Sequence, residues 1–150
     1  MSSSDEKSNG LACYHGHCFC GDVRFTIAAD VVPNTSLYCH CESCRRAHAA
    51  PLYQVVYIPA ESFRIVAGQE FVKAYSKSDG AVVRSFCQEC GSRIHNVVTE
   101  KPSLGIGFFP ALLEEEVQQN LPDIFKPRCH YLSNETVLSL SDWHDGLTRE

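Results

Sequence analysis

Seven of the nine cysteines stand in three tight groups, and this spacing constrains the fold more than any other feature of the chain. The groups are Cys18-x-Cys20, Cys39-x-Cys41-x-x-Cys44 and Cys87-x-x-Cys90. A disulfide framework is disfavoured, because the number is odd, no secretory signal is visible and 150 residues can bury a core without staples. Scattered buried thiols would not cluster in this way. Close thiol pairs are typical of zinc sites, so the spacing predicts metal binding.

Glycines divide the seven cysteines between two sites. Gly21 follows Cys20, and Gly91 follows Cys90. A zinc knuckle turns the chain sharply so that backbone N–H groups point at sulfur, and glycine permits the positive φ that such a turn often needs. The two matched pairs predict one closed, structural zinc site that ties the start of the domain to its middle. Its ligands would be Cys18, Cys20, Cys87 and Cys90.

The third group is built differently. Cys39 and Cys41 lie on one face if this segment is extended, and Cys44 lies one turn further on, with no glycine after it. Three ligands and a vacant position are the usual arrangement of a catalytic zinc. The alternative is a second closed site, and the candidates for its fourth ligand are His40, Cys13, Cys129 and His130. Spacing alone leaves both arrangements open.

Short segments of strand-forming residues dominate the rest of the chain. Strands are predicted at residues 22–28, 53–58, 63–66, 71–76, 81–86, 94–98, 104–109 and 137–140. A short helix is predicted at 42–49, a helical turn or two after Pro110, and a capped turn at 141–144. The pattern indicates a mainly β fold of small antiparallel sheets with a few short helices. We expect a disordered tail at residues 1–12 and a single domain at 13–150.

Charge and hydropathy exclude several classes of partner. The formal net charge is −5, and seven thiolates with two zinc ions would make it about −8, so the basic field that binds nucleic acid is absent. No window approaches the roughly 18 apolar residues of a membrane helix. The polar first ten residues hold no apolar run for a signal peptide. We therefore expect no nucleic-acid or membrane partner and a cytoplasmic, or nuclear, location. The oligomeric state is not predicted.

Three motifs resemble those of a known family. HCFCGDVRF at residues 17–25, CHCESCRR at 39–46 and SFCQECGS at 85–92 are similar, in order and spacing, to the motifs of the glutathione-dependent formaldehyde-activating enzyme and centromere protein V family. The resemblance runs from about Gly16 to Trp143 and implies an Mss4-like fold with two zinc ions. It implies that Cys18, Cys20, Cys87 and Cys90 bind structural zinc. Catalytic zinc would be bound by Cys39, Cys41 and Cys44.

The resemblance also implies an activity, which is condensation of formaldehyde with glutathione to S-hydroxymethylglutathione. In the reverse direction this is a carbon–sulfur lyase reaction. Arg45 and Arg46 adjoin the third group and are candidate contacts for glutathione carboxylates, although they could also face solvent or pair with Glu42. His130 is a candidate proton shuttle, or alternatively a packed, hydrogen-bonded residue. Trp143 is expected to pack in the core and anchor the terminus. Cys13 and Cys129 are expected to be ordinary thiols.

Two functions of different classes compete. The first is an enzyme that acts on an adduct of glutathione or a related thiol, and the second is a non-catalytic, zinc-stabilised binding module. A methionine sulfoxide reductase would use two CxxC pairs for zinc and a separate catalytic cysteine, which the group of Cys39, Cys41 and Cys44 fits poorly. We therefore expect a small thiol, most simply glutathione, as the partner molecule.

Overall fold

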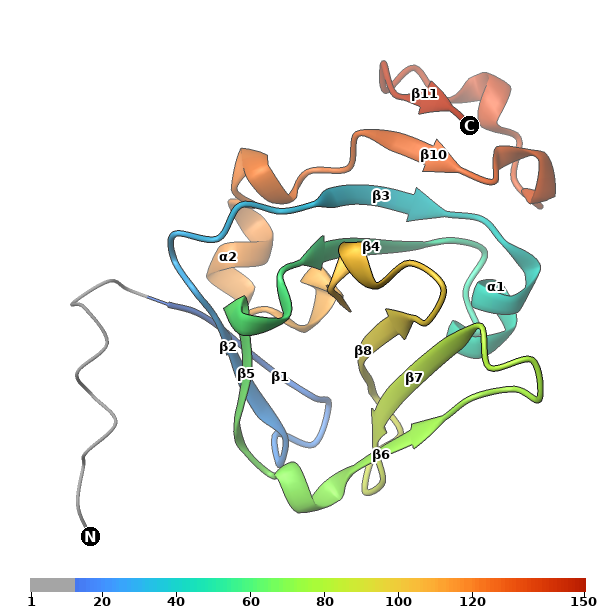
Figure 1. Ribbon diagram of the computed structural model, residues 1–150. Coiled ribbons are helices and arrows are strands. Elements are labelled where there is room, and N and C mark those ends of the chain that lie inside the picture. Colours follow the sequence, from blue (N-terminus) through green and yellow to red (C-terminus); the bar gives the residue numbers. More distant parts are fainter. Residues whose placement is uncertain (1–12) are drawn as a thin grey trace, which may run out of the picture.

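Two β-sheets dominate the part of the chain that the computed structural model describes, residues 13–150 (Figure 1). The smaller sheet is antiparallel, with strands in the order β1 (Tyr14–His17), β2 (Arg24–Ile27) and β5 (Phe63–Ala67). The larger has eight strands in the order β11-β10-β3-β4-β9-β8-β7-β6. The predicted mainly β fold is therefore confirmed. The predicted tail at residues 1–12 lies outside the described residues.

The bounds of the remaining elements show how short they are. The larger sheet contains β3 (Thr35–Cys39), β4 (Tyr53–Ile58), β6 (Val72–Tyr75), β7 (Val82–Cys87), β8 (Arg93–Val98), β9 (Ile106–Phe108), β10 (Cys129–Tyr131) and β11 (Thr148–Arg149). Two α-helices are present in the described residues, α1 (Glu42–His48) and α2 (Glu115–Gln119). Neither is long and apolar enough to span a bilayer.

One predicted strand is wrong. Residues 137–140 form no strand, and a 3₁₀ turn begins at Leu140. The backbone N–H of Leu138 donates to Thr136 Oγ1 (3.1 Å), and that of Leu140 donates to the Leu138 carbonyl oxygen (3.0 Å). Donors that are satisfied locally are no longer available to a neighbouring strand. The other seven predicted segments each overlap a strand of the structure.

Two parallel pairings bring the end of the chain to its first third. Strand β10 runs parallel to β3, with His130 opposite Tyr38 and Tyr131 opposite Cys39, and β11 adds to the other edge of β10. Helix α1 follows β3 almost directly. The third cysteine group is therefore bordered by residues about ninety positions later in the sequence.

Strand β4 is buried on both faces and separates the main core from a second, smaller apolar cluster. Val56 and Ile58 pack into the core between the sheets, together with Phe25, Ile94 and Phe108. The alternating side chains of β4, among them Val55 and Tyr57, face the opposite side and form a second apolar cluster. Because side chains alternate along β4, this one strand contributes residues to the main core on one face and to the second cluster on the other.

Candidate metal centres and the adjoining cavity

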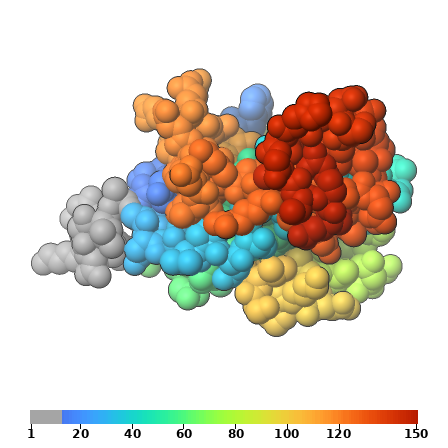
Figure 2. All heavy atoms as spheres, turned by 90° about the horizontal axis from the view of Figure 1, so that it is seen from above, coloured from blue at the N-terminus to red at the C-terminus, as the bar shows by residue number. Residues whose placement is uncertain are grey.

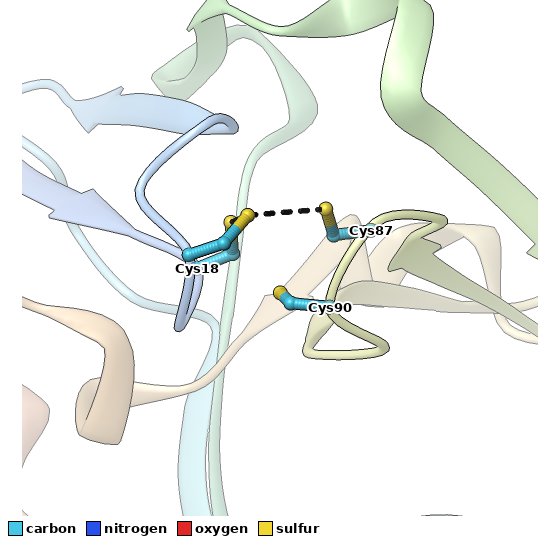
Figure 3. A group of neighbouring side chains, drawn as sticks. Cys18, Cys87 and Cys90 are labelled. Carbon is cyan, nitrogen blue, oxygen red and sulfur yellow. Dashed lines mark hydrogen bonds between the residues drawn. The ribbon is translucent and has the colours of Figure 1, made fainter.

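The first and last cysteine groups meet in a four-cysteine cluster. Cys18 and Cys20 lie between β1 and β2, while Cys87 ends β7 and Cys90 lies in the turn that follows it. Figure 3 shows Cys18, Cys87 and Cys90 pointing toward a common centre. All four sulfurs lie within 4.8 Å of one another, and two of the separations are 3.5 Å (Cys18–Cys20) and 3.9 Å (Cys20–Cys87). A tetrahedron of Zn–S bonds of about 2.3 Å has edges of about 3.8 Å, so zinc fits this donor set.

Both halves of the cluster are knuckle-like turns. Gly21 has φ +82° and Gly91 has φ +79°, which confirms the positive φ predicted at both positions. The Gly21 N–H donates to the Cys18 carbonyl oxygen (3.0 Å), and the Gly91 N–H donates to that of Cys87 (2.7 Å). The N–H of Val23 points at Cys18 Sγ over 3.4 Å. An N–H group that points at sulfur, as that of Val23 does, stabilises the thiolate form that a metal ligand requires.

The third group forms a three-cysteine cluster with a different surrounding. Cys39 ends β3, Cys41 precedes α1 and Cys44 lies in its first turns. Their sulfurs also lie within 4.8 Å of one another, and no fourth side-chain ligand atom in residues 13–150 joins them at that spacing. Cys41 Sγ caps α1 by accepting the N–H of Cys44 (3.2 Å). These three thiols could hold a metal and leave one position open.

Cys44 is the sulfur best prepared to carry negative charge. Hydrogen bonds from Cys39 and Cys41, followed by those from Tyr53 and Arg84, hold the pKa of its thiol well below its usual range. The Tyr53 hydroxyl donates to Cys44 Sγ over 3.4 Å, and Arg84 Nη2 donates over 3.5 Å. Burial raises the pKa of Tyr53, which keeps this hydroxyl neutral and a donor. Cys44 is therefore the thiol of this cluster that loses its proton most readily, whereas hydrogen bonds with Cys41 and Cys44 raise the pKa of Cys39.

Arg84 is a candidate site residue that was not singled out from the sequence, and it contacts the three-cysteine cluster through Cys44 Sγ. Its side chain is 6% exposed, and its Nε has no hydrogen-bond partner in the described residues. A zinc ion held by three thiolates would carry a net charge of −1, which the buried guanidinium of Arg84 would offset. A lone arginine inside the apolar predicted strand 81–86 was the available signal, because charged residues are seldom fully buried unless they are paired.

A cavity of about 560 Å³ opens from the three-cysteine cluster. Its floor is one face of β3 and β4, where Cys39 lies opposite Tyr53 and Leu37 lies opposite Val55. The opposite wall is supplied by the segment from β7 to the turn after β8: Val82, Asn96, Val98 and Leu104. Seen from above, the C-terminal segment, orange to red, borders the yellow segment around residue 100 (Figure 2). This volume lies in the range of small-molecule sites.

Two cations line the cavity away from the cysteines. The N–H of Arg128 bonds to the Ser36 carbonyl oxygen (3.0 Å), three residues before Cys39 and therefore about 10 Å from it along β3. Lys101 lies beside Leu104, whose carbonyl oxygen accepts from Asn34 Nδ2 (2.8 Å) at the same end. The cavity thus has a thiol end and an end with two cations, and the carboxylate of Glu150 lines it near Cys129.

The arginines singled out in the sequence lie elsewhere. Arg45 Nε donates to the His40 carbonyl oxygen (3.0 Å) and Arg45 Nη2 to that of Glu135 (3.2 Å). Arg46 pairs with Glu42 across one turn of α1 (3.0 Å) and its side chain is 79% exposed. Neither arginine lines the cavity.

His130 is buried behind the cavity. Its neighbours Cys129 and Tyr131 face the cavity, and the alternation of β10 turns His130 to the other side. Its Nδ1 lies 2.8 Å from His40 Nε2, and its Nε2 lies 2.7 Å from Asp145 Oδ2, so both ring nitrogens are occupied. The Trp143 ring packs edge-on against the His130 ring, with centroids 5.5 Å apart, but Trp143 is 38% exposed and does not lie in the core. The trio of His40, His130 and Asp145 anchors the C-terminal segment.

Comparison with known proteins identifies the family. Residues 13–131, which include all seven clustered cysteines, match the family described as glutathione-dependent formaldehyde-activating enzyme. The chain belongs to this family. A crystal structure of a Rhodobacter sphaeroides protein has the same fold, with a TM-score of 0.57 and 23% identity over 73% of this chain and 95% of that one. Membership of the formaldehyde-activating enzyme family and the two cysteine clusters together point to a zinc-binding function related to glutathione.

Proposed function

We propose that the protein catalyses the reversible addition of glutathione to formaldehyde at the three-cysteine cluster, with zinc at both clusters. The observation that carries this proposal is the polarity of the cavity. An open set of three thiols stands at one end, and Lys101 and Arg128 stand at the other. In this reaction a sulfur–carbon bond forms, the carbonyl double bond opens and the oxygen takes up a proton in place of the one that the thiol releases.

Glutathione carries the groups that the two ends of the cavity would bind. It carries one thiol, two carboxylates and one ammonium group at neutral pH. With the sulfur at Cys39, Cys41 and Cys44, its carboxylates extend toward the cationic end, about 10 Å away along β3. Arg128 can grip a carboxylate with two hydrogen bonds, and Lys101 supplies a point charge. We therefore assign the carboxylate contacts to these two residues in place of Arg45 and Arg46.

The chain's own residues prepare the chemistry. Zinc at this cluster supplies thiolate stabilisation and Lewis acidity toward the carbonyl oxygen. Three thiolate ligands weaken that acidity, and the guanidinium of Arg84, 3.5 Å from Cys44 Sγ, offsets part of their charge. The Tyr53 hydroxyl draws further charge from the same sulfur. The apolar walls formed by Leu37 and Val55 exclude water and strengthen these interactions.

The test measures zinc content and glutathione binding in the same protein. We expect two zinc ions per chain and a calorimetric binding isotherm for glutathione. Lys101→Ala and Arg128→Ala should each weaken binding about tenfold, because each removes one charge-assisted contact of about 1.5–3 kcal/mol before solvent screening. Arg46→Ala is the matched control and should bind like wild type, since Arg46 pairs with Glu42 outside the cavity. Two inert zinc ions and no glutathione binding would favour a non-catalytic binding module.

A further inference from the structure

The walls of the cavity are more apolar than its proposed ligands. Val55 is fully buried, and Leu37, Val98 and Leu104 pack against it with part of their surface left open. Val82 completes the apolar wall opposite the floor. Formaldehyde has one carbon, and glutathione is polar over most of its length. Neither provides an apolar group to cover this surface.

The position of this apolar surface is defined by the two polar ends. Leu37 is two residues before Cys39 on the same face of β3, so apolar side chains begin next to the thiol cluster. They continue toward Lys101 and Arg128 along the opposite wall. In the adduct the carbonyl carbon is bonded to the sulfur, so a substituent on that carbon begins two bonds away from the sulfur. It therefore lies against the apolar lining formed by Leu37 and Val98 while the thiol's carboxylates reach the cations.

We propose that the carbonyl substrate of this site carries an apolar substituent, so that the adduct is an S-(1-hydroxyalkyl)glutathione formed from an aliphatic or aromatic aldehyde. This inference rests on the proposed function for the thiol and extends it to the aldehyde. The step balances without a further reactant. The sulfur–carbon bond forms, the carbonyl double bond becomes a single bond, and the oxygen takes up one proton for the one that the thiol releases.

A cavity of about 560 Å³ agrees with this substrate class. Small-molecule sites measure roughly 300–1,000 Å³ and combine apolar walls with a few polar groups. One such group is the Asn96 carboxamide, which lines the cavity at 1% exposure and whose Oδ1 has no partner in the described residues.

The experiment measures binding of S-methyl-, S-butyl- and S-hexylglutathione to the zinc-loaded protein by calorimetry. All three lack a free thiol, so the trend within the series reports only the alkyl group. We expect Kd to fall about two- to fourfold for each added methylene, as burial of that group from water implies. Val98→Thr preserves volume but places a hydroxyl in the wall, and should reduce the dependence on chain length.

Val97→Thr is the matched control. Val97 is the preceding residue of β8 and is also half-buried, but it does not line the cavity, so its variant should keep the wild-type trend. If glutathione binds while Kd does not improve with chain length, the apolar-aldehyde inference is overturned and the proposed function stands. If neither glutathione nor any S-alkylglutathione binds, both are overturned.

Discussion

Replacement of Arg84 by methionine tests whether its charge supports the three-cysteine cluster. Its Nη2 lies 3.5 Å from Cys44 Sγ and its side chain is buried. Two unit charges at this distance in an effective dielectric of about 20 attract by about 5 kcal/mol, which is an upper limit. Relaxation and entry of water reduce it, and loss of an outer partner of a metal ligand usually lowers metal affinity about 10- to 100-fold. We expect Arg84→Met to weaken zinc binding at this cluster by that factor.

The assay is competition between the zinc-loaded protein and a coloured chelator. Zinc at the three-cysteine cluster should be lost at lower chelator concentration in the variant, while zinc at the four-cysteine cluster is retained. Arg93→Met is the control, because Arg93 also anchors α1, through the Ala47 carbonyl oxygen (2.9 Å), but donates to no cysteine sulfur. A change of less than threefold in Arg84→Met, or an equal change in Arg93→Met, would refute the charge argument.

Three further changes probe the knuckle, the cavity wall and a buried histidine. Cys90→Ser should lower the Tm measured by calorimetry by roughly 10 °C, because a structural zinc contributes to folding and each kcal/mol of lost stability lowers Tm by about 2–4 °C. An unchanged Tm with full zinc content would contradict this. Gly107→Ala should lower the free energy of unfolding in urea by about 1–3 kcal/mol, because its Cβ would lie 2.9 Å from Tyr57 Cε1 and would clash with Asn96 Oδ1. An unchanged free energy of unfolding would show that these side chains can move aside. Burial lowers the pKa of His48 to about 4, so the unfolded chain binds the extra proton and stability is lost as the pH falls from 6.5 toward 4. His48→Phe should remove up to about 3 kcal/mol of that loss, and identical pH profiles of the two proteins would rule the idea out.

Local sequence patterns predicted the strands that have strong propensity of their own. The segment that became β4 is rich in β-branched and aromatic residues, and its prediction at 53–58 matches the strand. Strands β1, β3, β10 and β11 were missed, because they contain few β-branched residues and owe their extended form to their neighbours. Strand β10 has three residues and lies between two parallel partners that no turn signal indicates. Tertiary pairing decides such strands.

The candidate site divides in the same way. By itself, the sequence determined the sets of four and three cysteines that the structure brings together, because close ligand spacing and the glycines after Cys20 and Cys90 are local features. Only the tertiary structure decided which charges face the thiols. Arg84 lies on β7 and Arg128 precedes β10, and both lie near the thiol cluster or its cavity. Arg45 and Arg46, although adjacent to Cys44 in the sequence, bond to the His40 carbonyl oxygen and to Glu42 outside the cavity. Proximity in sequence sets the geometry of a ligand turn, but electrostatic partners are selected by proximity in space.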